Sequence, residues 1–210
     1  MALDPRVEQK LSRLRIWNMA VGLVLAVEAI LMAALTNSFS LPVTATFISG
    51  PPGTTPSLQN LFSIPTGWGV FTFLLISAGA LLIIASPSVF PWYKRNLVQS
   101  RNYGRWIEYF FSSSIMIVLI SQITVISDIA ALIAIFGVNA SMILFGGLQE
   151  KYEKPGKPNL IPFWYGCFAG IIPWVAIVIY VIAPGLSVSP PGFVYGIVVS
   201  LFIFFKRGEA

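Results

Sequence analysis

The sequence contains no histidine and a single cysteine, and only 10% of its 210 residues are charged. The lack of histidine excludes imidazole metal ligands, Ser-His catalytic triads and histidine proton relays. One cysteine, Cys167, excludes an intrachain disulfide and a cysteine metal site. Soluble domains carry roughly 25% charged residues. The low charge, combined with 56% hydrophobic residues, therefore identifies an integral membrane protein.

Six apolar runs predict an all-α membrane protein, a bundle with six visible transmembrane helices. The runs lie at Trp17–Leu35, Val70–Phe90, Trp106–Ile126, Ile129–Phe145, Ile161–Ala183 and Phe193–Phe205. A spanning helix needs roughly 20 residues, so the sixth run is short. Either that helix is tilted into a thinned region of the bilayer, or, as we expect, the chain stops inside a longer element. The bundle would occupy residues 1–205, followed by a short atypical tail at residues 206–210.

The connections between the runs contain two clear signals. Ser127-Asp128, between the third and fourth runs, is typical of a tight turn that caps the next helix. The longest connection, from Thr36 to Gly69, carries no charge. Its segment Val43–Ile48 alternates enough for a short strand, and Pro51-Pro52-Gly53 would turn the chain back. We expect a small two-stranded flap there, with a low-complexity linker as the alternative.

The basic residues are distributed in a way that predicts the topology. All 13 lysines and arginines precede the first run, follow the sixth, or lie between the second and third or the fourth and fifth runs. The other connections have none. The positive-inside rule then places the N-terminus in the cytoplasm of a multi-pass protein of the cell membrane. Because the basic residues are short clusters between apolar runs, they do not indicate nucleic-acid binding.

Glu108 lies about one helical turn inside the third run, where an ionisable group costs several kcal/mol unless it is paired or hydrated. On a helix, Arg105, Glu108 and Ser112 share one face. Two interpretations stay open at this point. Glu108 could be a buried counterion that faces the bundle interior, or it could turn back to Arg105 in an interfacial ion pair. Glu28, the other charged residue within a run, could lie at a helix–helix or subunit contact, or pair with a polar group elsewhere.

The fifth and sixth runs are rich in aromatic residues. Trp164 could belong to the belt at the membrane interface. Trp174 and Phe202 lie deeper and could wall an apolar cavity, with lipid-facing core positions as the alternative. Pro173, in the middle of the fifth run, should kink that helix.

The segment Arg105-Trp106-Ile107-Glu108-Tyr109, which follows a long outer loop, resembles the third helix of the heliorhodopsins. The segments Pro162-Phe163-Trp164 and Phe193-Val194-Tyr195-Gly196 are similar too. The likeness extends over essentially the whole chain to about Phe205. Heliorhodopsins are retinal-binding photoreceptors with seven helices and a cytoplasmic N-terminus, and the count of basic residues gives the same orientation independently.

The resemblance implies all-trans retinal as the cofactor and Glu108 as the counterion of its protonated Schiff base. Ser77, Ser112 and Asn139 would lie near that base. Further retinal contacts would come from Tyr109, Met142, Trp164, Pro173, Trp174 and Phe202. The resemblance also implies a homodimer in the lipid bilayer that senses light for an unidentified signalling partner, without enzymatic activity or robust ion pumping.

One departure from the family concerns the attachment of retinal. The imine requires a lysine amine within a membrane span, and the family supplies it from the seventh helix. Every lysine of this sequence lies outside the six runs, and no seventh run is visible. We therefore expect a heliorhodopsin without its last helix, as a truncated chain or an incomplete record. The competing class is a non-pigmented membrane scaffold or small transporter, although internal repeats and polar midplane groups typical of transporters are not seen.

Overall fold

The computed structural model describes residues 4–153, 159–182, 192, 196, 199 and 200. The elements in chain order are α1 (Pro5–Leu35), β1 (Ser40–Phe47), β2 (Ser57–Pro65), α2 (Thr66–Ala85), α3 (Phe90–Val98), α4 (Tyr103–Ile123), α5 (Ile129–Tyr152) and α6 (Ile161–Ile182). All of these helices except the short α3 are long and apolar enough to cross a membrane. The fold is a helical membrane bundle with a small β-hairpin, as the sequence predicts.

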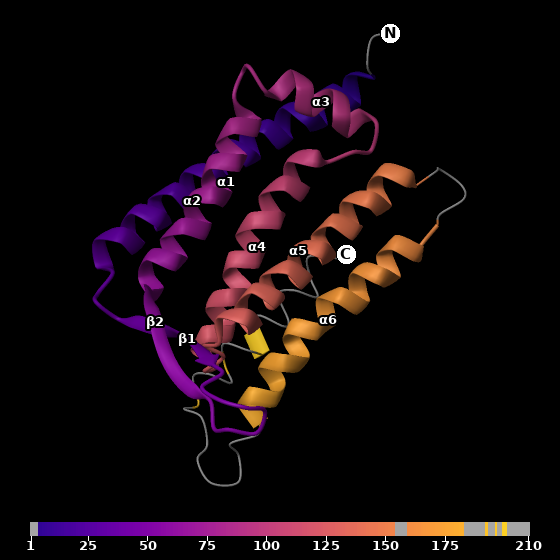
Figure 1. The fold of residues 1–210 in the computed structure, drawn as a ribbon. Helices are drawn as coiled ribbons and strands as arrows, with labels where there is room; N and C mark the ends of the chain where they lie inside the picture. Colours follow the sequence, from indigo (N-terminus) through magenta and orange to yellow (C-terminus); the bar gives the residue numbers. More distant parts are fainter. Residues whose placement is uncertain (1–3, 154–158, 183–191, 193–195, 197–198, 201–210) are drawn as a thin grey trace.

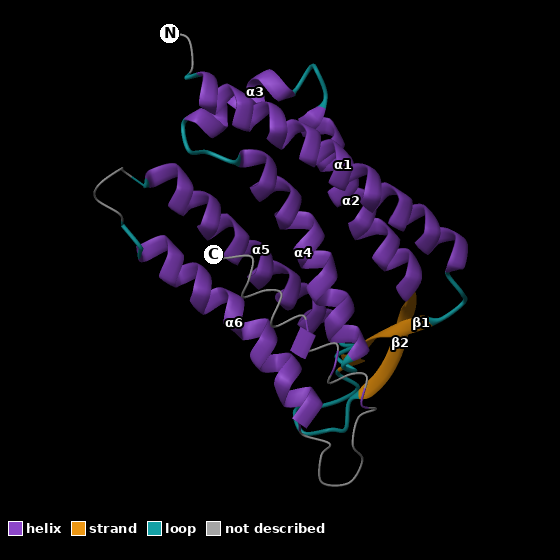
Figure 2. Ribbon diagram, turned by 180° about the vertical axis from the view of Figure 1, so that it is seen from behind, coloured by secondary structure: helices purple, strands orange, loops and turns teal. Residues whose placement is uncertain are grey.

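The spanning helices pack in chain order. α1 contacts α2, α2 contacts α4, α4 contacts α5, and α5 contacts α6 (Figure 1). The hairpin lies at one end of the bundle, and α3 lies at the other (Figure 2). We call these the hairpin end and the α3 end. Because α2 and α4 are neighbours, side chains from these two helices can meet inside the membrane-spanning region.

The helix boundaries differ from the apolar runs at several places. The second run was predicted to continue to Phe90, but α2 ends at Ala85 and Phe90 begins α3. The physical reason is Pro87, which disfavours the helical conformation of Ser86, and Ser86 is extended with ψ 150°. α1 begins well before the first run, because the Asp4 side chain accepts a hydrogen bond from the backbone N–H of Arg6. Apart from residues 196, 199 and 200, the sixth run lies outside the described residues.

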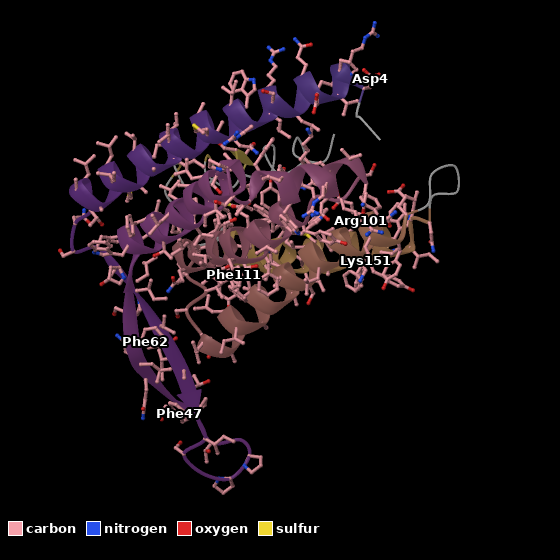
Figure 3. All side chains as sticks on the ribbon, turned by 90° about the horizontal axis from the view of Figure 1, so that it is seen from above. Asp4, Phe47, Phe62, Arg101, Phe111 and Lys151 are labelled. Carbon is pink, nitrogen blue, oxygen red and sulfur yellow. The ribbon has the colours of Figure 1, made fainter. Side chains whose placement is uncertain are left out.

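The predicted flap is confirmed as an antiparallel hairpin of β1 and β2. The turn between the strands contains Gly53 at φ 101°, a left-handed conformation that favours glycine. The hairpin projects from the helices, with Phe47 and Phe62 along it (Figure 3). The middle of β1 is attached to the helices by Thr44, whose N–H donates to the Ser127 carbonyl at 2.8 Å. The Thr44 and Ser127 hydroxyls are also 2.9 Å apart.

The predicted turn between the third and fourth runs is confirmed as well. The Asp128 side chain accepts hydrogen bonds from the N–H groups of Ala130 and Ala131 at 3.0 and 3.1 Å. The main hydrophobic core lies beside this turn, and β1, α4, α5 and α6 all contribute to it. Its buried members are Val43, Ile117, Ile120, Ile126, Leu132, Ile135, Trp174, Ile177 and Val181.

Candidate functional site

Glu108 is held by the neighbouring helix. α4 begins after Asn102, whose side chain accepts a hydrogen bond from the N–H of Arg105 at 3.2 Å, and this start places Glu108 inside the span. The Ser77 hydroxyl on α2 donates a hydrogen bond to the Glu108 carboxylate. Both side chains are half-buried. The structure therefore brings together two of the predicted site residues, from the neighbouring spans α2 and α4.

Arg105 points to a different partner. Its guanidinium lies 4.5 Å from the centre of the Trp106 ring, and the residue is exposed. Among the described residues the ion pair that forms is Lys94 with Glu8, at 2.9 Å, and Arg105 and Glu108 do not pair. The interpretation of Glu108 as an interfacial ion pair is therefore wrong. Arg105 and Glu108 share a helix face and could reach each other. In the structure, however, the Trp106 ring is the better-placed partner for Arg105, and the Ser77 hydroxyl is the better-placed partner for Glu108.

Asn139 ties α5 to α4 beside the predicted site. The residue is 4% exposed, and its amide N–H₂ donates to the Ser113 hydroxyl at 2.9 Å and the Ser114 hydroxyl at 3.1 Å. Ser112 is also buried, at 7% exposure. From the sequence, Ser113 and Ser114 are expected to be polar packing positions of the third run rather than site residues, and three consecutive serines inside a span are a signal for polar contacts between helices.

The residues predicted to contact the body of retinal fall into two groups. Trp174 and Pro173 are buried in α6, which continues as one helix through Pro173. Met142 lies against α6, because its sulfur occupies the space that a Cβ at Gly170 would need. Two further predicted contacts, Trp164 and Tyr109, are 65% and 45% exposed, so the described residues do not enclose them. Phe202 lies outside the described residues.

A second polar cluster lies at the α3 end, and the sequence gave little sign of it. One Glu150 carboxylate oxygen accepts hydrogen bonds from the Trp106 indole N–H at 2.5 Å and the Asn102 backbone N–H at 2.7 Å. Tyr93 on α3 is 5% exposed. Burial raises the pKa of the Tyr93 phenol, and hydrogen bonds with Asn102 and Asn18 partly offset this rise. Glu150 was missed because a carboxylate at the end of an apolar run resembles an ordinary loop charge.

Glu28 is exposed on α1, and the described part of the chain gives it no hydrogen bond or ion pair. It therefore does not join the cluster of Ser77 and Glu108. The expectation of a contact between helices is not met within the described bundle, and the alternative of a contact with a second subunit stays a prediction.

The match to known families fits this arrangement. The family model described as Heliorhodopsin matches residues 14–207, which include four of the five described spans in full and the first span from residue 14 onward. This chain belongs to the heliorhodopsin family. A comparison with curated proteins gave no match. Membership in the family implies a membrane protein that binds retinal and senses light, as heliorhodopsins generally do.

The described residues of this heliorhodopsin fit one half of a retinal site. Glu108 provides a carboxylate inside the span, and its hydrogen bond to Ser77 fixes that carboxylate in place. The other half is a lysine amine. Within the described spans the lysines are Lys10 and Lys151, near helix ends at the α3 end, so these spans do not supply an attachment amine in their interior.

Proposed function

We propose that this heliorhodopsin is a light-sensing receptor in which Glu108 is the counterion of the retinal Schiff base. The single observation that carries the proposal is the hydrogen bond from Ser77 to Glu108 between two membrane spans. A positive charge in an apolar bundle requires a fixed anion close by. A carboxylate that a neighbouring helix holds by a hydrogen bond is suited to this role, whereas a carboxylate paired with Arg105 would not be.

The residues around Glu108 have complementary roles in this proposal. Ser77 orients the carboxylate, while the buried polar contacts of Asn139 with the serines of α4 fix the spacing of α4 and α5. Trp174 and Met142 would hold the apolar body of retinal, which supplies light absorption when it is bound. A shift of positive charge near Glu108 would weaken or strengthen its hydrogen bond to Ser77. Local charge changes of this kind bias two-state helix arrangements.

The orientation and assembly of the receptor belong to the same proposal. The basic residues favour a cytoplasmic N-terminus in the cell membrane, because the α3 end carries charged residues such as Arg101 and Lys151 (Figure 3). We propose a homodimer that signals to an unidentified partner rather than pumping ions. In the described part of the chain, no group of three or more carboxylate or cysteine side chains lies close enough together to hold a metal ion.

A visible spectrum tests the proposed function. All-trans retinal is added to membranes that contain the expressed protein, and hydroxylamine is then added to test for an imine. A red-shifted band that hydroxylamine bleaches is the result that supports the proposal, and it would mean that a lysine outside the described spans supplies the imine. If no band forms under conditions in which a known retinal protein is reconstituted, the chain is not a photoreceptor by itself, and the non-pigmented scaffold is favoured instead.

A further inference from the structure

A groove of about 450 Å³ runs between α2 and α4 and ends at α3. Its volume lies in the range of small-molecule sites. Almost all of its wall is aliphatic or aromatic. The residues that line the groove include Leu75, Gly79, Ile83, Trp92, Ile107 and Phe111. Glu108 also lines the groove, so the groove reaches the carboxylate that Ser77 binds.

The groove opens sideways from the bundle. Ile83 of α2 and Ile107 of α4 are 60% and 61% exposed, and Leu75 and Phe111 are 49% and 47% exposed. Both walls are membrane spans. An apolar groove between two spans is filled by the medium next to them, which at this depth consists of lipid acyl chains. An acyl chain in the groove would also separate Glu108 from water.

Charged and aromatic residues mark the end of the groove at α3. Trp92 lines the groove, and Arg95 follows three residues later, so the two share one face of α3. Tryptophan is enriched at the level of lipid headgroups. Arg95 is exposed, and among the described residues the ion pair of α3 is made by Lys94 instead. Arg95 does not line the groove itself, but its exposed side chain on the Trp92 face of α3 is within reach of a headgroup at the groove end, and a guanidinium is suited to phosphate.

We propose that this groove is a binding site for one anionic phospholipid. An acyl chain lies between α2 and α4 over Glu108, and the phosphate is bound by Arg95. Gly79 supports this reading, because no atom lies within 4 Å of the position that a Cβ would take there. The groove is therefore open at Gly79, and a larger side chain at this position would fill it without a clash against the protein.

Lipid retention by the full chain provides the test. The detergent-purified protein is mixed with phosphatidylglycerol or phosphatidylcholine, and native mass spectrometry counts the retained lipids. The wild type should retain one phosphatidylglycerol, and Gly79→Leu should abolish this retention. The matched control is Gly137→Leu, because Gly137 on α5 also has no atom within 4 Å of its Cβ position but lies outside the groove. Arg95→Gln should weaken phosphatidylglycerol binding about fivefold, the effect of one basic residue near an anionic headgroup.

The other outcomes overturn the proposal. Equal retention by Gly79→Leu and the wild type would show that the lipid binds elsewhere, and equal loss in Gly137→Leu would show non-specific binding. A wild type that retains no lipid but forms dimers, which Gly79→Leu prevents, would assign the groove to a second copy of the chain. Gly79→Ala, a small change that helices tolerate well, should reduce retention partly and serves if Gly79→Leu does not fold. These measurements need no retinal, so the result is independent of whether the pigment forms.

Discussion

Ser77 donates a hydrogen bond to Glu108 across the contact between α2 and α4, and this bond fixes the carboxylate of the third predicted span. The consequence is that the proposed counterion depends on two helices. A movement of α2 relative to α4 changes the hydrogen bonding of Glu108 directly. Arg105, which is nearer in sequence, is occupied by the Trp106 ring and does not neutralise the carboxylate.

This relationship predicts a graded effect on the absorption band of the retinal-loaded protein. Glu108→Gln should shift the band strongly, because the fixed negative charge is lost. Ser77→Ala should shift it less, since the charge stays and only one hydrogen bond to a charged group, worth about 1.5–3 kcal/mol, is lost. Ser141→Ala is the matched control, because the Ser141 hydroxyl bonds to the Gly137 carbonyl of its own helix at 2.8 Å. An unchanged band in Glu108→Gln would remove Glu108 from the counterion role.

The parts of the fold that depend on local patterns could be predicted from the sequence. Hydrophobic runs predicted the described spans, and Ser127-Asp128 predicted the turn and helix cap that are found. The alternation in Val43–Ile48 predicted a strand of the hairpin. Each of these features is determined by residues close together in the chain, so the sequence pattern is sufficient.

The parts that depend on packing could not be predicted in this way. The bond between Trp106 and Glu150 joins residues 44 apart, and it exists because α4 and α5 pack side by side. The direction of Arg105 depends on a choice between partners, which helix spacing leaves open. The docking of Thr44 on Ser127 likewise requires the hairpin to fold back onto the bundle. In each case the sequence supplies the polar groups, and the packing of the helices and the hairpin decides which of these groups are in contact.

Val43 should be the main anchor of the hairpin. Its side chain is 0% exposed and belongs to the hydrophobic core with Trp174 and Ile177. Val43→Ala removes two methyl groups and should lower the free energy of unfolding by about 2 kcal/mol. Leu58→Ala on β2 is the control, since Leu58 is 69% exposed and surface changes usually stay within about 0.5 kcal/mol. Denaturant unfolding in detergent measures both, and equal effects would mean that β1 does not anchor the hairpin.

The burial of the Tyr93 phenol predicts how the free energy of unfolding changes at alkaline pH. Burial raises the pKa of Tyr93 above its ordinary value of 10.0, so the folded protein keeps the phenolic proton at a pH where the unfolded chain loses it. The stability that the buried, protonated Tyr93 phenol contributes is complete below pH about 10 and is lost as the pH rises through the raised pKa. Tyr93→Phe should therefore flatten the fall in stability above pH about 10. Tyr152→Phe, at a 64% exposed position, is the control, and an identical slope in both variants would contradict the prediction.

Two adjacent glycines of α5 should respond oppositely to the same substitution. A Cβ at Gly146 would lie 2.4 Å from Cζ3 of the Trp106 ring, whereas a Cβ at Gly147 would lie at an ordinary 3.5 Å from Cγ of that ring. The ring cannot simply move away, because its N–H is bound by Glu150 at 2.5 Å. Gly146→Ala should therefore cost about 1–3 kcal/mol of stability. Gly147→Ala should gain up to about 1 kcal/mol from helix propensity.

The double variant Trp106→Leu with Gly146→Ala separates this clash from a general effect of alanine at position 146. Removing the indole should abolish most of the cost of Gly146→Ala, and the coupling energy between residues in contact is expected at about 0.5–3 kcal/mol. Thermal unfolding of the four variants in one detergent gives the cycle. If Gly146→Ala is as stable as Gly147→Ala with Trp106 present, then the bond to Glu150 does not hold the ring, and α4 and α5 are free to slide at the α3 end.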